Sequence, residues 1–215
     1  MNTIPNGWPA RVLYLHGFRS SPLSAKARFV RERLAQDAPA TQWLCPQLPA
    51  SPAAAMALIL ELTACWPRGD GGTLVMGSSL GGFYAVQAAH ALQARAVLLN
   101  PAVSPERDLA RHLGLQTQWH DPAQRLDFRP EFLPELQAQQ AAIAREGMRE
   151  RLSPTSAFAL ITQGDEVLDW REMHSAHASA RCHVLPGGDH AISDFAQHWP
   201  LIAAFIRQPP ETSAQ

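Results

Sequence analysis

Short apolar segments alternate with longer helical ones along most of this chain, and this order constrains the fold more than any other feature. Strands separated by helices pair in parallel, because the chain crosses back over the sheet before each new strand begins. We therefore expect an α/β protein with a mostly parallel sheet of about six strands and helices on both faces. The expected strands are residues 11–15, 41–45, 73–77, 95–100, 158–163 and 181–186.

Two of the expected helices have a recognisable start. A serine able to accept a hydrogen bond from the first turn, followed by proline at the first helical position, is typical of a helix N-terminus. This pattern occurs at Ser21-Pro22 and again at Ser51-Pro52. We expect further helices over residues 80–92, 132–152, 170–178 and 192–206.

Length and composition favour one globular domain over residues 1–208. The chain has 215 residues, of which 46% are hydrophobic and 17% are charged, and about 150 residues is a usual domain size. More than fifty residues separate the fourth and fifth expected strands, and so long a connection is usually functional. We interpret residues 101–156 as a small helical insertion that forms a cap or lid. The polar tail, residues 209–215, is expected to be disordered.

The charge balance gives no reason to expect nucleic acid as a partner, because the formal net charge is -1. The densest basic stretch, residues 26–34, fits a helix whose cations lie on its solvated face. The longest apolar run, residues 53–60, is far shorter than the roughly 20 residues that span a bilayer, so we expect no stable membrane insertion. The oligomeric state stays open.

The cysteines and the N-terminal residues favour a cytoplasmic protein. Cys45, Cys65 and Cys182 stand far apart and form no CxxC pair, as expected of free thiols in a reducing compartment. The first residues, MNTIPNGWPAR, lack the basic and then apolar order of a signal peptide.

The stretch GSSLG, residues 77–81, fits the pattern G-x-S-x-G with Ser79 at its centre. An expected strand leads into it and an expected helix leaves it, which is the context in which such a turn exposes a serine hydroxyl. Glycine on either side relieves the crowding of so sharp a turn. The motif alone fits a plain strand-to-helix turn equally well. Phosphate loops do not fit, because the stretch has neither Gly-Lys nor GxGxxG.

A nucleophilic serine needs a histidine base, which a carboxylate holds in the right tautomer. Two later segments supply these residue types in the order Ser, Asp, His, each directly after an expected strand: Asp165 follows residues 158–163, and His190 follows residues 181–186. The alternative acid is Asp169, about one helical turn further on. We favour Asp165, because catalytic groups gather at the carboxyl ends of parallel strands.

The first strand and its exit loop read LYLHGFRSSP and contain His16 and Phe18. An oxyanion hole of this kind takes one N–H from the residue after the nucleophile and one from a loop after an earlier strand. We therefore predict Leu80 and Phe18 as the backbone donors. The same loop also fits a glycine-softened turn that leads to a helix.

Metal binding has little support in the sequence. His174 and His177 stand three residues apart on one expected helix, but no third ligand is in register, and we interpret both as surface residues. We expect neither a metal nor a cofactor.

Five ordered segments, YLHGFRSSPLSAKA, GSSLGGFYA, NPAVSP, QGDEVLDW and GGDHAISDF, together resemble the YqiA-like esterases, a bacterial branch of the α/β-hydrolase superfamily. The resemblance covers most of residues 11–206. It implies a three-layer α/β-hydrolase-type sheet, no cofactor, and hydrolysis of carboxylic esters or thioesters by Ser79, Asp165 and His190. Residues 106–154 do not match the family's pattern.

The expected function is that of a serine esterase acting on a small-molecule ester or thioester, with acyl-CoA among the candidates. An acyltransferase on the same triad and a noncatalytic binding protein on the same scaffold are the alternatives. His16, Trp119, Phe132 and Leu136 are candidates for the substrate pocket, since ligand pockets are mostly apolar. The apolar residues of the insertion could equally serve only to pack helices onto the sheet.

Overall fold

The computed structural model describes residues 7–119, 121 and 123–208, so the predicted tail 209–215 lies outside the described residues. Its main sheet has six strands in the order β2-β1-β3-β4-β7-β8, and every neighbouring pair is parallel. The strands confirm the six expected from the sequence to within one residue at either end. They are β1 (Arg11–Leu15), β2 (Gln42–Leu44), β3 (Thr73–Ser78), β4 (Arg95–Leu99), β7 (Ala157–Thr162) and β8 (Arg181–Leu185).

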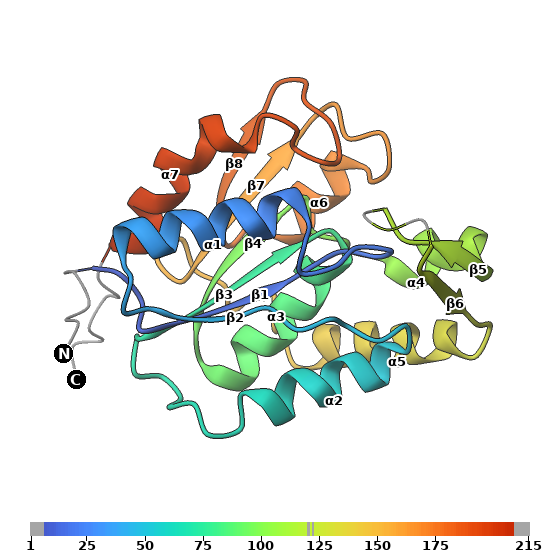
Figure 1. Cartoon of the computed structure of the whole chain (residues 1–215). Coiled ribbons are helices and arrows are strands. Elements are labelled where there is room, and N and C mark those ends of the chain that lie inside the picture. Colours follow the sequence, from blue (N-terminus) through green and yellow to red (C-terminus); the bar gives the residue numbers. More distant parts are fainter. Residues whose placement is uncertain (1–6, 120, 122, 209–215) are drawn as a thin grey trace.

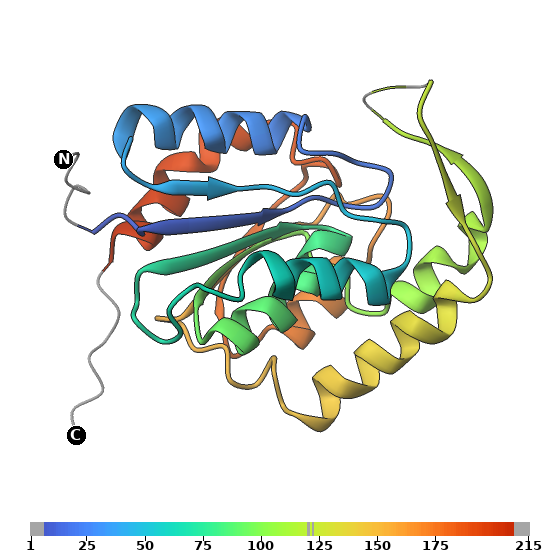
Figure 2. The ribbon, with the colours of Figure 1, turned by 60° about the horizontal axis from the view of Figure 1, so that its bottom comes forward.

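Helices cover both faces of this sheet, as Figures 1 and 2 show. On one face lie α1 (Ala25–Asp37) and α7 (Phe195–Arg207), which bury Val30, Trp199 and Ile202 among the side chains of the strands. The core of the other face receives α2 (Pro52–Leu62), α3 (Leu80–Leu92), α5 (Phe132–Arg145) and α6 (Trp170–Ala176). The three-layer α/β architecture expected from the sequence is therefore confirmed. None of the helices among the described residues is both long and apolar enough to cross a membrane.

One of the two predicted helix starts is correct and the other is wrong. Ser51 caps α2 by accepting a hydrogen bond from Ala54 N–H, with Pro52 in the first turn. Helix α1 begins at Ala25 and is capped by Ser24, which accepts from Ala27 N–H. Ser21 instead accepts from the N–H of Leu23 in a turn before the helix. Ser21-Pro22 therefore forms a turn that precedes the helix, and α1 begins three residues after Pro22.

The insertion between β4 and β7 is only partly helical. It contains the short helices α4 (Pro105–Leu109) and η1 (Ala110–His112), then the antiparallel strands β5 (Gly114–Thr117) and β6 (Arg125–Phe128), then α5. The hairpin was not predicted from the sequence, and α5 ends at Arg145 rather than at residue 152. Figures 1 and 2 show the hairpin beyond the end of the sheet toward which β1 and β3 point. Because β4 and β7 are parallel, the insertion also carries the chain from one end of the sheet to the other.

Candidate active site

Ser79 occupies the sharp turn between β3 and α3. Its backbone has φ 55° and ψ -122°, a strained conformation for a residue with a side chain. The turn brings its flanks so close together that a Cβ on Gly77 would lie 2.1 Å from the carbonyl oxygen of Gly81. A Cβ on Gly81 would lie 2.0 Å from the carbonyl oxygen of Leu15. Both glycines of the motif are therefore required by backbone contact.

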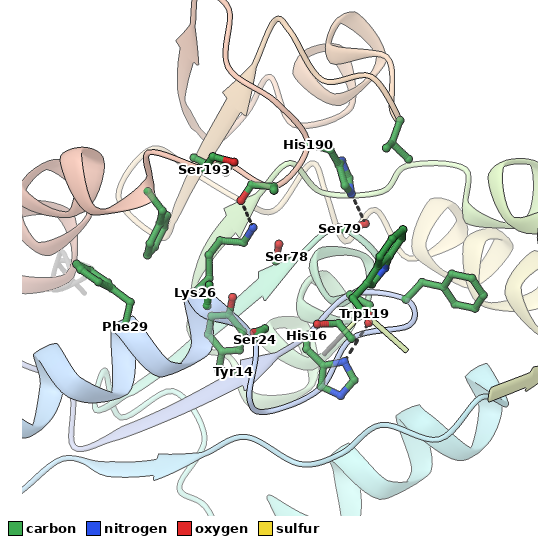
Figure 3. Close-up of a pocket in the computed structure, with 18 of the residues that line it drawn as sticks. Tyr14, His16, Ser24, Lys26, Phe29, Ser78, Ser79, Trp119, His190 and Ser193 are labelled. Carbon is green, nitrogen blue, oxygen red and sulfur yellow. Dashed lines mark hydrogen bonds between the residues drawn. The ribbon is translucent and has the colours of Figure 1, made fainter. Parts of the chain in front are cut away.

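A chain of hydrogen bonds joins Ser79 to His190 and His190 to Asp165. The Ser79 Oγ lies 3.0 Å from Nε2 of His190, and Nδ1 of the same ring lies 2.7 Å from Asp165 Oδ2. An ionised carboxylate only accepts, so Nδ1–H donates to Asp165 and the Nε2 lone pair accepts from the serine hydroxyl. Figure 3 shows the bond between His190 and Ser79. The imidazole is thus held in the tautomer that can take a proton from Ser79.

The Asp165 carboxylate is fixed from both sides. Its side chain is completely buried, and Oδ1 accepts hydrogen bonds from the N–H groups of Val167 and Leu168, at 2.8 Å each. Asp169, the alternative acid, caps α6 and accepts from Arg171 N–H. The structure thus brings Asp165 to the histidine and uses Asp169 to start a helix.

Asn100 holds the loop that carries Asp189 and His190, called the histidine loop, against the end of the sheet. This role was not predicted from the sequence. It is fully buried directly after β4, with φ 41°. Its Nδ2 donates to Thr162 Oγ1 at 2.9 Å and to the carbonyl oxygens of Asp189 and His190 at 3.2 Å each. Its Oδ1 accepts from Thr162 N–H at 2.9 Å. An asparagine at a strand end just before proline was the available signal, since asparagine tolerates positive φ.

The loop after β1, which contains the predicted donor Phe18, passes close to Ser79. It passes so near the serine that a Cβ on Gly17 would lie 3.2 Å from Ser79 Cβ. The two predicted oxyanion donors belong to the next residues in sequence, Phe18 after Gly17 and Leu80 after Ser79. Within the ranges that the structure describes, neither N–H has an acceptor in the protein. Both are free to bind an oxygen of a ligand.

A cavity of about 660 Å³ opens at Ser79 and His190 (Figure 3). Of the four pocket candidates, His16 and Trp119 line it. His16 is almost fully buried and fixes the loop: its Nε2 accepts from Leu48 N–H at 3.1 Å, and its Nδ1 lies 3.0 Å from Gly17 O. Phe132 and Leu136 do not belong to the described lining residues. They are buried in the core instead, because α5 turns this face inward against the sheet-covering helices.

The insertion is docked onto the loop after β1. The Phe18 ring packs edge-on against the Phe128 ring of β6, with centroids 5.1 Å apart. Arg19 Nε donates to the carbonyl oxygen of Thr117 at 2.7 Å, and its guanidinium lies 4.1 Å above the Trp119 ring. The hairpin and the loop after β1 are therefore in direct contact through aromatic, hydrogen-bond and cation–π interactions.

Lys26, the only lysine of the chain, lines the same cavity from α1. The prediction that the cations of residues 26–34 lie on a solvated helix face is wrong for Lys26, which is half-buried. Its Nζ donates to the carbonyl oxygen of Ala191, in the loop that leads into α7. Burial lowers the pKa of the Lys26 ammonium to about 8, and the nearby carboxylates of Asp189 and Asp165 oppose this shift.

The two histidines of α6 and its C-terminus are not alike. His174 is exposed, whereas His177, interpreted from the sequence as a surface residue, is fully buried. Its Nδ1 lies 2.9 Å from Met173 O, and burial lowers its pKa to about 4. His177 is therefore a neutral core residue. In the described part of the chain, no group of three His, Cys, Asp or Glu side chains is placed to hold a metal ion.

Solved structures with this architecture are α/β hydrolases. A structure of the metagenome-derived lipolytic enzymes LipS and LipT matches with a TM-score of 0.66 and 18% identity, over 95% of this chain and 96% of that one. Mouse α/β-hydrolase domain-containing protein 10 matches with a TM-score of 0.65 and 15% identity, over 94% and 90%. Est1E from Butyrivibrio proteoclasticus matches with a TM-score of 0.64 and 13% identity, over 96% and 90%. The fold is therefore the α/β-hydrolase fold.

The chain belongs to the family described as Uncharacterised protein family (UPF0227), whose model matches residues 11–207. The match includes residues 106–154, so the expectation that this segment departs from the family's pattern is wrong. This is the YqiA-like family, so the resemblance seen in the five sequence segments is confirmed.

Proposed function

We propose that this protein is a serine ester hydrolase in which Ser79 is the nucleophile, His190 the base and Asp165 the residue that orients the base. The observation that carries the proposal is the unbroken chain of hydrogen bonds from Ser79 through His190 to Asp165, at the mouth of a cavity. A serine hydroxyl is a weak nucleophile at neutral pH, and an adjacent base of this kind activates it. A buried carboxylate on Nδ1 selects the required tautomer.

In the first step, Ser79 Oγ attacks the carbonyl carbon of the ester while His190 Nε2 takes the hydroxyl proton. The carbonyl oxygen becomes an oxyanion, which the N–H groups of Phe18 and Leu80 stabilise. When the tetrahedral intermediate collapses, the bond to the leaving oxygen or sulfur breaks. The leaving alcohol or thiol receives the proton from His190, and an acyl group remains on Ser79.

In the second step, water attacks the acyl carbon and gives its proton to His190. The bond from the acyl carbon to Ser79 Oγ then breaks, and Oγ takes that proton back. The free acid leaves and the enzyme returns to its starting state. The Asp165 carboxylate stabilises the imidazolium that forms in both steps.

Carboxylic esters and thioesters are the proposed substrate class. Support comes from relatives in structure that are described as lipolytic enzymes, and from Est1E, whose structure holds ferulic acid. The cavity volume of about 660 Å³ lies within the usual range for small-molecule sites. We further propose that the protein acts in the cytoplasm, with Cys45, Cys65 and Cys182 as free thiols.

An acyltransferase would share the first step and differ only in the acceptor of the acyl group. Product analysis with and without an added alcohol separates the two, since a transferase forms the new ester in preference to the free acid. A noncatalytic binding protein would need neither the Ser79 turn nor the ordered histidine. The strain at Ser79 therefore favours catalysis over binding alone.

The direct test is labelling with a fluorophosphonate, which reacts with activated serines, followed by mapping of the modified peptide. We expect labelling at Ser79 in the wild type and none in Ser79→Ala or His190→Ala. Ser175→Ala, which removes an exposed serine of α6, is the control and should label fully. A folded wild type that does not label at Ser79 would refute the proposal.

A further inference from the structure

The cavity extends beyond Ser79 and His190 into the space between the sheet and the helices α1 and α7. Tyr14 of β1 and Lys26 and Phe29 of α1 line this part, together with Ile192 of the loop before α7 and Phe195, the first residue of α7. Figure 3 shows Tyr14, Lys26 and Phe29 around the hollow, on the far side of Ser78 from Trp119. We call this part of the cavity the inner pocket. The mechanism proposed above uses none of these side chains.

The Tyr14 hydroxyl is the unusual group of the inner pocket. Tyr14 is completely buried, and its hydroxyl has no hydrogen-bond partner in the part of the chain that the structure describes. Burial raises the pKa of the phenol above its ordinary value, so the hydroxyl keeps its proton and remains a donor. A buried polar group without a partner is unfavourable. A ligand that accepts this hydrogen bond would remove that cost.

Lys26 places a positive charge in the same pocket. Its Nζ donates to the carbonyl oxygen of Ala191, and an ammonium has three N–H groups. The charges of two carboxylates, Asp189 and Asp165, act on the ammonium, but both carboxylates accept hydrogen bonds from other groups. Asp189 accepts from the side chain and N–H of Ser193, and Asp165 accepts from His190. The ammonium therefore has donors to offer a ligand.

We propose that the inner pocket binds a free carboxylate carried by the substrate, with Lys26 Nζ and the Tyr14 hydroxyl as its donors. This inference rests on the proposed esterase function and narrows its substrate class to esters that bear one carboxylate. The aromatic and aliphatic side chains of Phe29, Ile192 and Phe195 suit a short apolar spacer between the carboxylate and the ester. Hemiesters of short dicarboxylic acids have this chemistry.

The charges of the lining favour a carboxylate over a phosphate group. Lys26 is the only lysine or arginine among the described lining residues. One ammonium and a neutral phenol match one negative charge. A phosphate monoester carries nearly two charges at neutral pH, and Glu166, which also lines the cavity, would repel the second.

The kinetic test compares mono-4-nitrophenyl glutarate with neutral 4-nitrophenyl pentanoate, and its readout is the ratio of their kcat/KM values. We expect the ratio to fall by about 10- to 100-fold in Lys26→Met, as for the loss of a hydrogen bond to a charged group. Lys26→Arg should restore part of it, and Tyr14→Phe should lower it several-fold. Arg28→Met, which removes an exposed cation of the same helix, is the matched control. If Lys26→Met slows both esters equally, the lysine only holds the Ala191 loop and the proposal is wrong.

A second measurement reads binding without turnover. Because the chain has one lysine, Ser79→Ala protein grown with 13Cε-lysine gives a single side-chain NMR signal. Glutarate should shift this signal and raise the pH at which it titrates, whereas butyrate and inorganic phosphate should do so much less. A wild type that hydrolyses neither ester but shows the glutarate shift would refute the esterase and keep the pocket. Hydrolysis without any preference or shift would refute the pocket and keep the esterase.

Discussion

The ring of Phe18 stands edge-on against the ring of Phe128, with centroids 5.1 Å apart. Phe18 belongs to the loop after β1, and its own N–H is a proposed oxyanion donor. Phe128 ends the second strand of the hairpin. Phe128 in turn contacts Phe132 at the start of α5, with centroids 5.7 Å apart. The position of the donor loop therefore depends on packing in the insertion, more than a hundred residues away in sequence.

Phe128→Leu should lower kcat by more than its loss of stability alone explains. The smaller side chain loses the edge-on contact, so the Phe18 loop is held less firmly. Complete loss of an oxyanion donor costs about 10²- to 10³-fold in kcat, and loosening one donor should cost about tenfold. Steady-state kinetics with urea denaturation would measure both. Phe158→Leu, an equally buried change on the α1 and α7 face of the sheet, should destabilise the protein similarly and leave kcat nearly unchanged; equal kcat losses in both variants would contradict this view.

Asn100→Asp should displace the histidine loop, although the new side chain has nearly the same size. The change replaces a donor by an acceptor opposite the carbonyl oxygens of Asp189 and His190. We expect the rate of fluorophosphonate labelling to fall by about 100-fold, as for the displacement of a base, and the pH profile of labelling to shift.

The control for this prediction is Gln93→Glu, which makes the same amide-to-acid change at another residue of positive φ. Gln93 is exposed at the end of α3, away from the cavity. It should label at the wild-type rate with the wild-type pH profile. Unchanged labelling of a folded Asn100→Asp protein would show that the loop does not need this anchor.

Gly81→Ala should destabilise the protein although helix propensity favours it. Alanine is better than glycine inside a helix by about 1 kcal/mol. Here the new Cβ would lie 2.0 Å from the carbonyl oxygen of Leu15, so the turn and β1 must separate. We expect a loss of at least about 3 kcal/mol or a failure to fold. Thermal unfolding and circular dichroism would decide it, and a variant as stable as the wild type would contradict the close contact.

Lys26 should make stability rise with pH in alkaline solution. Its pKa is about 8 in the folded protein, against an ordinary value of 10.5. Between these pH values the unfolded chain holds a proton that the folded protein has released. By linkage, the free energy of unfolding then increases as the pH rises.

Urea denaturation of the wild type and Lys26→Met between pH 7 and pH 10 tests this linkage. The stability of the wild type relative to the variant should increase from about pH 8 upward. For Arg28→Met the difference from the wild type should stay flat, because the arginine keeps its proton throughout this window. A flat difference for Lys26→Met as well would mean that Lys26 is fully hydrated.

The strands of the sheet and the grouping of Ser79, Asp165 and His190 were predictable because their sequence signals are local. Each strand is a short apolar run, and Ser79, Asp165 and His190 each lie within a few residues after the end of a strand. Lys26 was misplaced because nothing near it in sequence shows that residues 190–196 cover its helix face. Phe132 and Leu136 were assigned to the pocket because their apolar character fits a pocket and a core equally well. The hairpin was missed because β5 and β6 are stabilised by distant contacts, such as Phe128 with Phe18.

The parallel pairing of β4 with β7 divides the insertion into two parts with different freedom to change. The hairpin leaves and returns at nearby points, so its length and side chains can vary without breaking the path of the chain. The segment that contains α5 must bridge the two ends of the sheet, and parallel neighbours need a crossover of about a dozen residues or more. A relative with a new substrate range could therefore exchange most of the hairpin, but it would have to keep a contact like that of Phe128 with Phe18 and a crossover in place of α5.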